Sequence, residues 1–447
     1  MENKEDKKLI QDYEREPVPA DKRKGWFKLS IVWIGSIVAL SATALGGAIG
    51  GGLSMPHAIL ATLAGCFILA VLSALCSVVG AKTGLSTSFV SIFALGRYGS
   101  YAVSAIIAIS LFGWFGVQVD LFGSSLRSIL LDVFNIDVNQ KILIIIGGIL
   151  MTTTAFIGFK AIEKLSLIAV PLLALLLIGS LIRVMNGHSL SEVAAAPLTA
   201  EPLSIGVSIS LIIGSLAVGA IIGPDIARYA KSPKDAVISS FVGFFGGFSI
   251  VLLIAAMLAK ATSQVDIVSI MLGLGWGTGA MLILILAQWT TNDNNLYSSA
   301  LGFSVIFRKT PKYILTIFAG LIGTVMAVGG IYDYFIPFLS FLSVLIPPIG
   351  GIYVADYLLN REKYTFEQVD LQENINIFGV SIWVLSALIA FMTTPAPTGF
   401  GFFTLTGASG FDAFLIAFGL QLIVSKTWQS FKRPALIAKQ GRNIQLD

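Results

Sequence analysis

The stretch LILILAQWTTNDNNLYSSALGF, residues 282–303, is an apolar run of membrane-spanning length that six consecutive hydrogen-bonding side chains interrupt. Those six run from Thr290 to Asn295. Amide and carboxyl groups are costly inside a bilayer unless they face protein, water or a ligand. On a helix Thr290 and Asn294 share one face, as do Thr291 and Asn295, so the polar groups form stripes. Hydrogen bonding between packed helices explains one or two such residues, whereas six in a row, with a carboxylate among them, favour a binding site.

The composition is that of a polytopic membrane protein. Of 447 residues, 55% are hydrophobic and 12% are charged, against about 25% charged in a typical soluble domain. At about 20 residues per span, there is room for about twelve helices and none for a sizeable soluble domain. Cys66 and Cys76 share one apolar segment without metal-binding spacing, so neither a disulfide nor a metal site is predicted. The first 25 residues are charged and mostly polar, and no secretory signal peptide is expected there.

The distribution of basic residues predicts the orientation in the membrane. With the amino terminus in the cytoplasm, 25 of the 29 Lys and Arg residues fall on the cytoplasmic side, a strong positive-inside bias. The net charge of +4 therefore reflects topology and does not indicate a nucleic-acid partner. The exceptions are Arg127, Lys141, Arg183 and Lys260.

Twelve spans are expected, with both ends of the chain in the cytoplasm. The spans are expected at about 27–50, 57–80, 100–130, 141–158, 162–185, 204–226, 236–260, 276–306, 313–330, 333–358, 375–394 and 411–426. The expected organisation is a cytoplasmic segment 1–26, a first five-span repeat 27–185, a second repeat 204–358, two further spans within 375–426, and a cytoplasmic tail 427–447.

The first and sixth spans each carry small residues that an uninterrupted helix does not favour. In the first span they run from Ala42 to Gly52, where unwinding is expected. In the sixth they are Gly214, Ser215, Gly219, Gly223 and Pro224. Spans five apart cross in opposite directions, as two inverted five-helix repeats require, and paired interrupted spans point to a transporter binding site. Close packing through small residues is the alternative. The tenth span is expected to kink at Pro347–Pro348.

The third span places Trp114 and Gln118 four residues apart, on one face of a helix. An indole can stack on a flat ring, while an amide offers both a donor and an acceptor to the edge of that ring. Packing is the alternative for the tryptophan. Asp120 lies about 200° around the helix from Gln118, off that face, and is expected to serve packing or a proton relay. Asp293 is the other candidate for carrying a proton.

Five motifs carry a family resemblance. They are GAKTGLS (80–86), GWFGVQ (113–118), PDIARYAKS (224–232), WTTNDNNLY (289–297) and PPIGGIYVADYL (347–358). With them, the chain resembles the nucleobase-cation-symport family 1 (NCS1), in its cytosine permease and purine/cytosine permease branch, over nearly its whole length. The resemblance implies an all-α polytopic membrane protein with a LeuT-like fold, in which two inverted five-helix repeats with discontinuous first and sixth helices are followed by two more helices. It also implies import of a nucleobase or related heterocycle by alternating access.

The resemblance also implies roles for individual residues. Trp114 matches the aromatic on which the ring stacks, and Gln118 matches an amide that contacts the substrate in hydantoin-type members. The other implied substrate-side positions are Ser215, Leu216, Asn292 and Asn295. The implied Na⁺ site comprises the hydroxyls of Thr290 and Thr291 and the backbone carbonyls of Ala39, Ala42 and Ala287.

Three departures from the cytosine permease pattern concern the substrate. Leu216 stands where those permeases carry a second aromatic residue, while Leu111 and Ala287 replace a glutamine and an asparagine. A lost hydrogen-bond partner to a buried polar ligand costs about 1–3 kcal/mol. A ring other than cytosine, such as a purine or a modified pyrimidine, is therefore expected.

The sequence predicts a secondary active transporter of the bacterial cytoplasmic membrane that imports a nucleobase-like ring with Na⁺, without a cofactor or an obligate protein partner. The alternative is an H⁺-coupled importer of another small heterocycle, such as a hydantoin or a thiamin-precursor pyrimidine. An intramembrane enzyme is a remote alternative, because no nucleophile, metal cluster or second acid converges with Asp120 or Asp293. A ligand sensor is equally remote, because no soluble output domain is expected.

Overall fold

The structure is a computed structural model that describes residues 17–157, 159–307 and 309–443, most of them helical. Within these residues one isolated β-bridge joins Lys24 to Ala230. The α-helices in chain order are α1 (Trp26–Ile37), α2 (Leu40–Gly52), α3 (Met55–Thr83), α4 (Thr87–Phe134), α5 (Gln140–Ile157), α6 (Phe159–Met185), α7 (Leu190–Ala195), α8 (Ile205–Ile221), α9 (Gly223–Ala227), α10 (Pro233–Ser240), α11 (Phe248–Thr262), α12 (Ile267–Gly273), α13 (Gly277–Ile306), α14 (Lys312–Val328), α15 (Phe335–Leu345), α16 (Pro347–Leu359), α17 (Ile377–Thr393) and α18 (Ser409–Asn443).

Each expected span coincides with a helix or a pair of helices. Six described helical segments are long and apolar enough to cross a membrane, and the bent pair α1–α2 makes a seventh. Shorter apolar helices stand at the fourth, sixth, ninth and eleventh positions, and α13, with the polar run inside it, stands at the eighth. The helices are consistent with twelve crossings, but the count stays a prediction because length and composition alone identify seven.

The first span is broken, but at a different place from the one expected. The axes of α1 and α2 differ by 68° across Val38 and Ala39, and Ala39 has an extended backbone with φ −136° and ψ 159°. The glycine-rich run from Ala42 to Gly52 is helical, so the expectation that it unwinds is wrong. Its glycines permit close packing instead: a Cβ at Gly50 would lie 2.6 Å from the backbone of Ala256 on α11.

The sixth and tenth spans are interrupted where the sequence predicts. Leu216 has non-helical φ and ψ of −122° and 17° within α8, and Ile222 separates α8 from α9. A side chain at Gly214 would overlap the Leu339 carbonyl, so this glycine allows α8 to approach α15. In the tenth span, α15 ends before Ile346 and α16 begins at Pro347, because proline lacks an N–H for the preceding turn.

A further break, at Gly96 in α4, is not predicted from the sequence. Gly96 adopts φ +78°, a left-handed conformation that glycine tolerates. The segment after α16 satisfies the freed backbone groups, since Asn376 N–H donates to Leu95 O (3.0 Å) and Tyr98 N–H donates to Asn374 O (2.8 Å). Burial raises the pKa of the Tyr364 phenol in the same segment.

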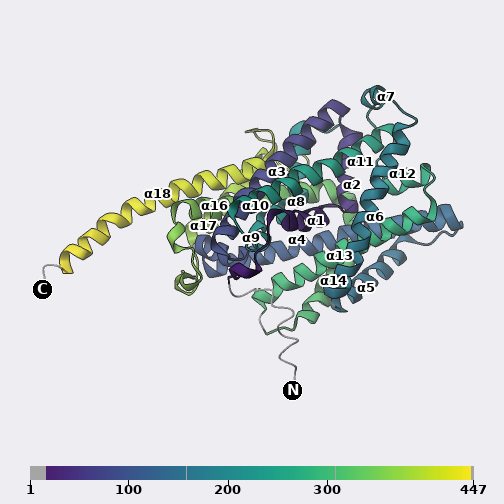
Figure 1. The fold of residues 1–447 in the computed structure, drawn as a ribbon. Helices are drawn as coiled ribbons and strands as arrows, with labels where there is room; N and C mark the ends of the chain where they lie inside the picture. Colours follow the sequence, from purple (N-terminus) through teal and green to yellow (C-terminus); the bar gives the residue numbers. More distant parts are fainter. Residues whose placement is uncertain (1–16, 158, 308, 444–447) are drawn as a thin grey trace, which may run out of the picture.

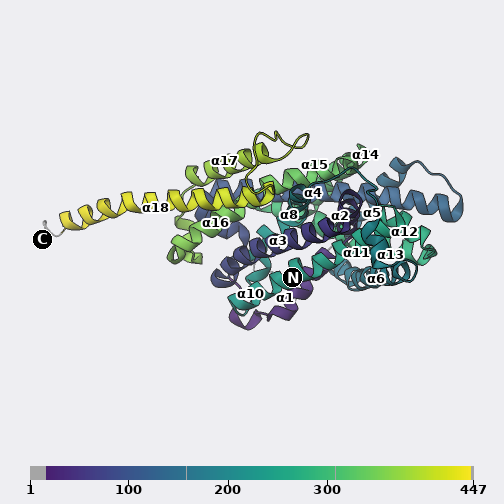
Figure 2. The same cartoon turned by 90° about the horizontal axis from the view of Figure 1, so that it is seen from above.

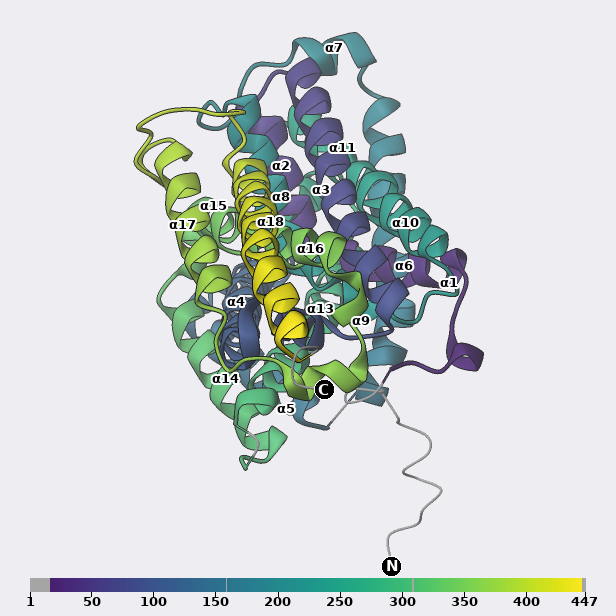
Figure 3. The same ribbon diagram turned by 90° about the vertical axis from the view of Figure 1, so that its left-hand side faces the viewer.

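Helices α4 and α13 pack against each other in the interior of the bundle (Figure 1). Ser299 of α13 donates to the Ala108 carbonyl of α4 (2.8 Å), which ties the last third of α13 to the middle of α4. Helices α17 and α18 lie side by side on one flank (Figure 3). The far end of α18 extends well beyond the bundle (Figures 1 and 2), so helix continues into residues expected to form the tail.

Candidate functional site

The polar run lies within one continuous helix, α13, so its side chains point in several directions. Successive residues of an α-helix are rotated by about 100°. The hydroxyls of Thr290 and Thr291 both donate to the carbonyl of Ala287, over 3.1 and 2.9 Å. Asn294 is exposed and Asn295 is half-buried. The run is therefore divided among several environments and does not form one polar surface.

Asn292 faces α4 and α5. Its side chain is fully buried, and its Nδ2 donates to the Phe115 carbonyl of α4 (3.2 Å) and lies 3.1 Å from the Met151 sulfur of α5. Both partners are acceptors, which fixes the orientation of the amide. Its Oδ1 has no hydrogen-bond partner among the described residues. The amide group thus links helices through its nitrogen while its oxygen stays available.

Asp293 also faces α5. Its carboxylate is 1% exposed and accepts a hydrogen bond from the Thr154 hydroxyl of α5 (2.7 Å). The same hydroxyl accepts from the indole Nε1 of Trp289 (2.9 Å). A chain of hydrogen bonds therefore joins α13 to α5, and in this structure Asp293 takes part in helix packing.

Trp114 and Gln118 lie one turn apart on α4, as the sequence predicts. Phe335 and Phe338 of α15 meet the Trp114 indole edge to face, with ring centroids 6.1 and 5.4 Å away. The Nε2 of Gln118 points to the hydroxyl of Ser41 at the start of α2, 3.5 Å away. Helices α2, α4 and α15 thus meet at these two side chains.

The burial of Trp114 and Gln118 has a consequence for ligand access. The exposed fractions are 8% for Trp114 and 0% for Gln118. Neither side chain is open to solvent in this structure. A ligand that reaches them requires a movement of the surrounding helices.

Asp120 points away from Gln118, as its angular position predicts. Its carboxylate accepts from the Gln140 side chain (3.1 Å) and from the backbone N–H of Tyr332 (3.1 Å). Asp120 therefore ties α4 to the start of α5 and to the turn before α15, which is a packing role.

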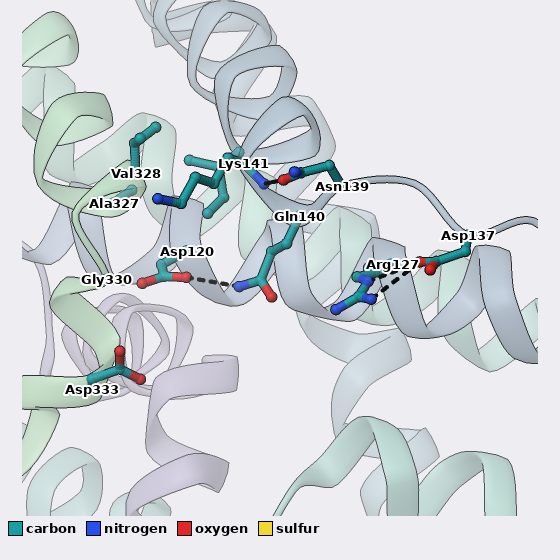
Figure 4. A pocket seen from close by; sticks show the side chains of 11 residues that line it. Asp120, Arg127, Asp137, Asn139, Gln140, Lys141, Ala327, Val328, Gly330 and Asp333 are labelled. Atoms are coloured by element: carbon teal, nitrogen blue, oxygen red, sulfur yellow. Dashed lines mark hydrogen bonds and ion pairs between the residues drawn. The ribbon is translucent and has the colours of Figure 1, made fainter.

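A cavity of about 520 Å³ lies beside Asp120, in the carboxyl-terminal part of α4, and Figure 4 shows the side chains that line it. Arg127, Lys141 and Asp333 also line it, and Arg127 pairs with Asp137 over 3.1 Å. Trp114 and Gln118 do not line this cavity. Its charged lining suits solvent and ions better than a stacked ring, so it is not the predicted ring site.

The sixth-span candidates lie close to the kink in α8. The Ser215 hydroxyl donates to the Ile212 carbonyl (2.8 Å), and Leu216 is half-buried at the non-helical position. Helix α8 contacts α15 through Gly214 and Leu339. Leu216 and Trp114 belong to the same hydrophobic core.

The oxygens expected to bind Na⁺ fall into two groups. On α13, the Ala287 carbonyl and two threonine hydroxyls cluster within hydrogen-bond distance, a set of hard oxygen donors that suits Na⁺. On α2, Ala39 is the extended residue at the break, and its carbonyl accepts from the N–H of Ala42 (3.1 Å). Ala42 itself lies inside α2. The oxygens of α13 and the carbonyl of Ala39 belong to different helices, and the Na⁺ site stays a prediction.

Three polar residues of this region are absent from the sequence-based predictions: Ser41, Thr154 and Gln288. Gln288 is fully buried and donates to the Ser125 hydroxyl of α4 (3.1 Å). Its position directly before Trp289 at the start of the polar run is a signal that the sequence contains. Ser41 and Thr154 become noticeable only through their partners on other helices.

Comparison with known proteins gives the family. The family of permeases for cytosine/purines, uracil, thiamine and allantoin matches residues 17–413. The chain belongs to this family. The cytosine permease of Escherichia coli O157:H7 is 37% identical over 353 residues, which cover 79% of this chain and 82% of that protein. The hydantoin permease of Microbacterium maritypicum is 22% identical over 419 residues, covering 84% and 82%. The chain is therefore a multi-pass membrane permease and not an enzyme.

Solved structures agree with the fold of this permease. The inward-facing conformation of Mhp1 has a TM-score of 0.78 at 19% identity, and the likeness covers 92% of this chain and 93% of that one. The closed conformation of Mhp1, an NCS1 transporter with bromovinylhydantoin bound, has a TM-score of 0.73 over 93% and 96% of the two chains. The expected fold class is confirmed.

Proposed function

We propose that this permease imports a flat nitrogen heterocycle together with Na⁺ by alternating access. The observation that carries the proposal is the pair Trp114 and Gln118, an indole and an amide one turn apart on α4, beside the break between α1 and α2. The indole supplies a face for stacking and the amide a polar contact for the ring edge. The related cytosine and hydantoin permeases support this class of substrate.

Two replacements relative to the cytosine permease pattern bear on the choice of ring. Leu216 stands where those permeases carry a second aromatic residue, and Ala287 stands where they carry an asparagine. These replacements favour a ring other than cytosine itself, such as a purine, a hydantoin or a modified pyrimidine.

Coupling to Na⁺ rests on the oxygen cluster of α13. The Ala287 carbonyl and the hydroxyls of Thr290 and Thr291 lie within about one helical turn. Carbonyls at a broken helix complete such a site in transporters, and Ala39, at the break between α1 and α2, is the candidate for that role. Proton coupling is the second candidate, supported by the buried carboxylate of Asp293. The proposed location is the bacterial cytoplasmic membrane, with both termini inside the cell.

Thermal stabilisation of the detergent-purified permease tests the proposal. Cytosine, adenine, a hydantoin and a thiamin-precursor pyrimidine are each added in NaCl and in choline chloride. A ligand that binds only the folded state stabilises it by about 2.7 kcal/mol at a hundred times its Kd. One ring is expected to raise the melting temperature, and more so in NaCl.

Two substitutions test whether the ring binds at Trp114. Trp114→Ala is expected to abolish the ring-dependent shift, whereas Trp114→Phe, which keeps an aromatic face, retains part of it. The melting temperature of each variant without ligand shows whether it is folded. If no ring stabilises the wild-type permease in either salt, the proposal is wrong.

A further inference from the structure

Gln118 has an acceptor that nothing in the described part of the chain satisfies. The side chain is 0% exposed, its Nε2 points to the Ser41 hydroxyl, and its Oε1 has no hydrogen-bond partner. A buried carbonyl oxygen without a donor is unfavourable, and native proteins retain few such atoms. Gln118 stands one helical turn from Trp114, and a ligand that stacks on that indole can bring the missing donor.

Asn292 is a second amide whose nitrogen has a protein partner and whose oxygen has none among the described residues. Asn292 gives its Nδ2 to the Phe115 carbonyl, a group that only accepts, so its Oδ1 is the atom left without a partner among the described residues. The two amides come from α4 and α13, and each uses its N–H on protein. These two amides thus offer acceptors, and a ligand that supplies hydrogen-bond donors matches them.

Ser41 has a particular place in this arrangement. It is the second residue of α2, directly after the 68° bend, and its side chain is half-buried. Its hydroxyl lies 3.5 Å from the Gln118 amide nitrogen. Because the bend determines where the hydroxyl lies, the first span supplies the partner of the Gln118 amide nitrogen.

We propose that Ser41 is a positioning and specificity-determining residue: it holds the Gln118 amide so that Oε1 faces the ring site, and the permease therefore selects heterocycles with an unsubstituted ring N–H at that edge. The inference rests on the proposed function, since it requires a ring stacked on Trp114. Alkylation of the ring nitrogen that faces Oε1 removes the donor and leaves Oε1 buried without a partner. Rings that present only acceptors at this edge are rejected for the same reason.

A purely structural serine predicts a different outcome. If Ser41 only joined α2 to α4, its loss would lower stability and would weaken binding of all rings by a similar factor. A positioning role instead changes the ratio between two rings that differ only at one nitrogen. That ratio is the quantity to measure.

The test compares the ring that stabilises the wild-type permease with its N-methylated analogues, one for each ring nitrogen. Dissociation constants are measured by competition binding to the wild type, Ser41→Ala, Ser41→Thr and the control Ser36→Ala. Ser36 is exposed on α1, and its hydroxyl donates to the Val32 carbonyl and not to Gln118. One analogue is expected to bind the wild type and the Ser36→Ala variant at least about tenfold more weakly than the parent ring, the effect of one lost hydrogen bond to a buried group.

In Ser41→Ala this ratio is expected to fall to about threefold or less, with the melting temperature without ligand unchanged, and Ser41→Thr is expected to restore it. Gln118→Met, which keeps the length of the side chain without its polar atoms, is expected to erase the ratio and tests the Oε1 acceptor. If Ser41→Ala fails to fold, Ser41→Cys, which keeps the size of the side chain but hydrogen-bonds weakly, replaces it and is expected to lower the ratio. If Ser41→Ala keeps the wild-type ratio of dissociation constants, or if every methylated ring binds the wild type as well as the parent ring does, the inference about Ser41 is wrong while the proposed function stands. A wild type that binds no ring overturns the proposed function as well.

Discussion

The Thr291 hydroxyl is the group on which the proposed ion coupling can be tested most directly. It donates to the carbonyl of Ala287 one turn earlier (2.9 Å) and adds an oxygen to the proposed cation site. Thr291→Ala removes that oxygen, so the Na⁺ concentration for half-maximal ring binding is expected to rise about tenfold, equivalent to about 1.4 kcal/mol. Thr324→Ala is a matched control, because Thr324 is also half-buried and its hydroxyl also donates to a carbonyl four residues earlier. An unchanged Na⁺ titration in Thr291→Ala would remove this residue from the site.

Helix α2 depends on its glycines for contact with α11. A Cβ at Gly50 would lie 2.6 Å from the Cα and carbonyl oxygen of Ala256, and backbone atoms cannot yield as a flexible side chain can. Gly50→Ala is therefore expected to destabilise the permease by about 1–3 kcal/mol, the usual effect of overpacking. Gly35→Ala on α1 is the control, since its Cβ meets nothing within 4 Å and alanine favours a helix. Melting temperatures in detergent separate the two; equal values would contradict the packing role.

The orientation of the whole molecule can be determined by cysteine labelling. Cys66 and Cys76 are both fully buried, so the wild-type chain is a suitable background. Ser191→Cys on α7 is expected to react with an impermeant maleimide in intact cells, because positive-inside bias places α7 outside. Glu373→Cys, on the segment after α16, is expected to react only after permeabilisation. Both positions are exposed, and the reverse pattern of labelling would invert the proposed topology.

Three of the four basic residues on the predicted outer side have local partners. Arg127 pairs with Asp137, and the Arg183 guanidinium lies over the Trp276 ring at 5.7 Å. The Lys260 ammonium is 1% exposed and donates to the carbonyls of Ala196 and Pro197, over 3.3 and 3.1 Å. These contacts explain why three basic residues can lie on the predicted outer side. The excess of Lys and Arg on the other side therefore still indicates the orientation of the chain.

The class of protein, the approximate positions of the helices and the family can all be predicted from the sequence alone. Long apolar runs have to form helices in a bilayer, because every backbone polar group there needs a partner within the segment. The interruption of the sixth span, the kink at Pro347 and the opposite directions of Gln118 and Asp120 also follow from local patterns within single helices.

Which polar groups serve packing and which remain available depends on how the helices pack. The glycine-rich run from Ala42 to Gly52 is compatible either with an unwound helix or with close packing against another helix. In the structure the run is helical and packs closely against α11. Asn292 and Asp293 are predicted from the sequence to be site residues. In the structure the Asn292 amide nitrogen donates to a carbonyl of α4, and the Asp293 carboxylate accepts from a hydroxyl of α5. The link between Ser41 and Gln118 joins residues far apart in the chain. Such pairings depend on how the helices pack against one another, which no local pattern in the sequence encodes.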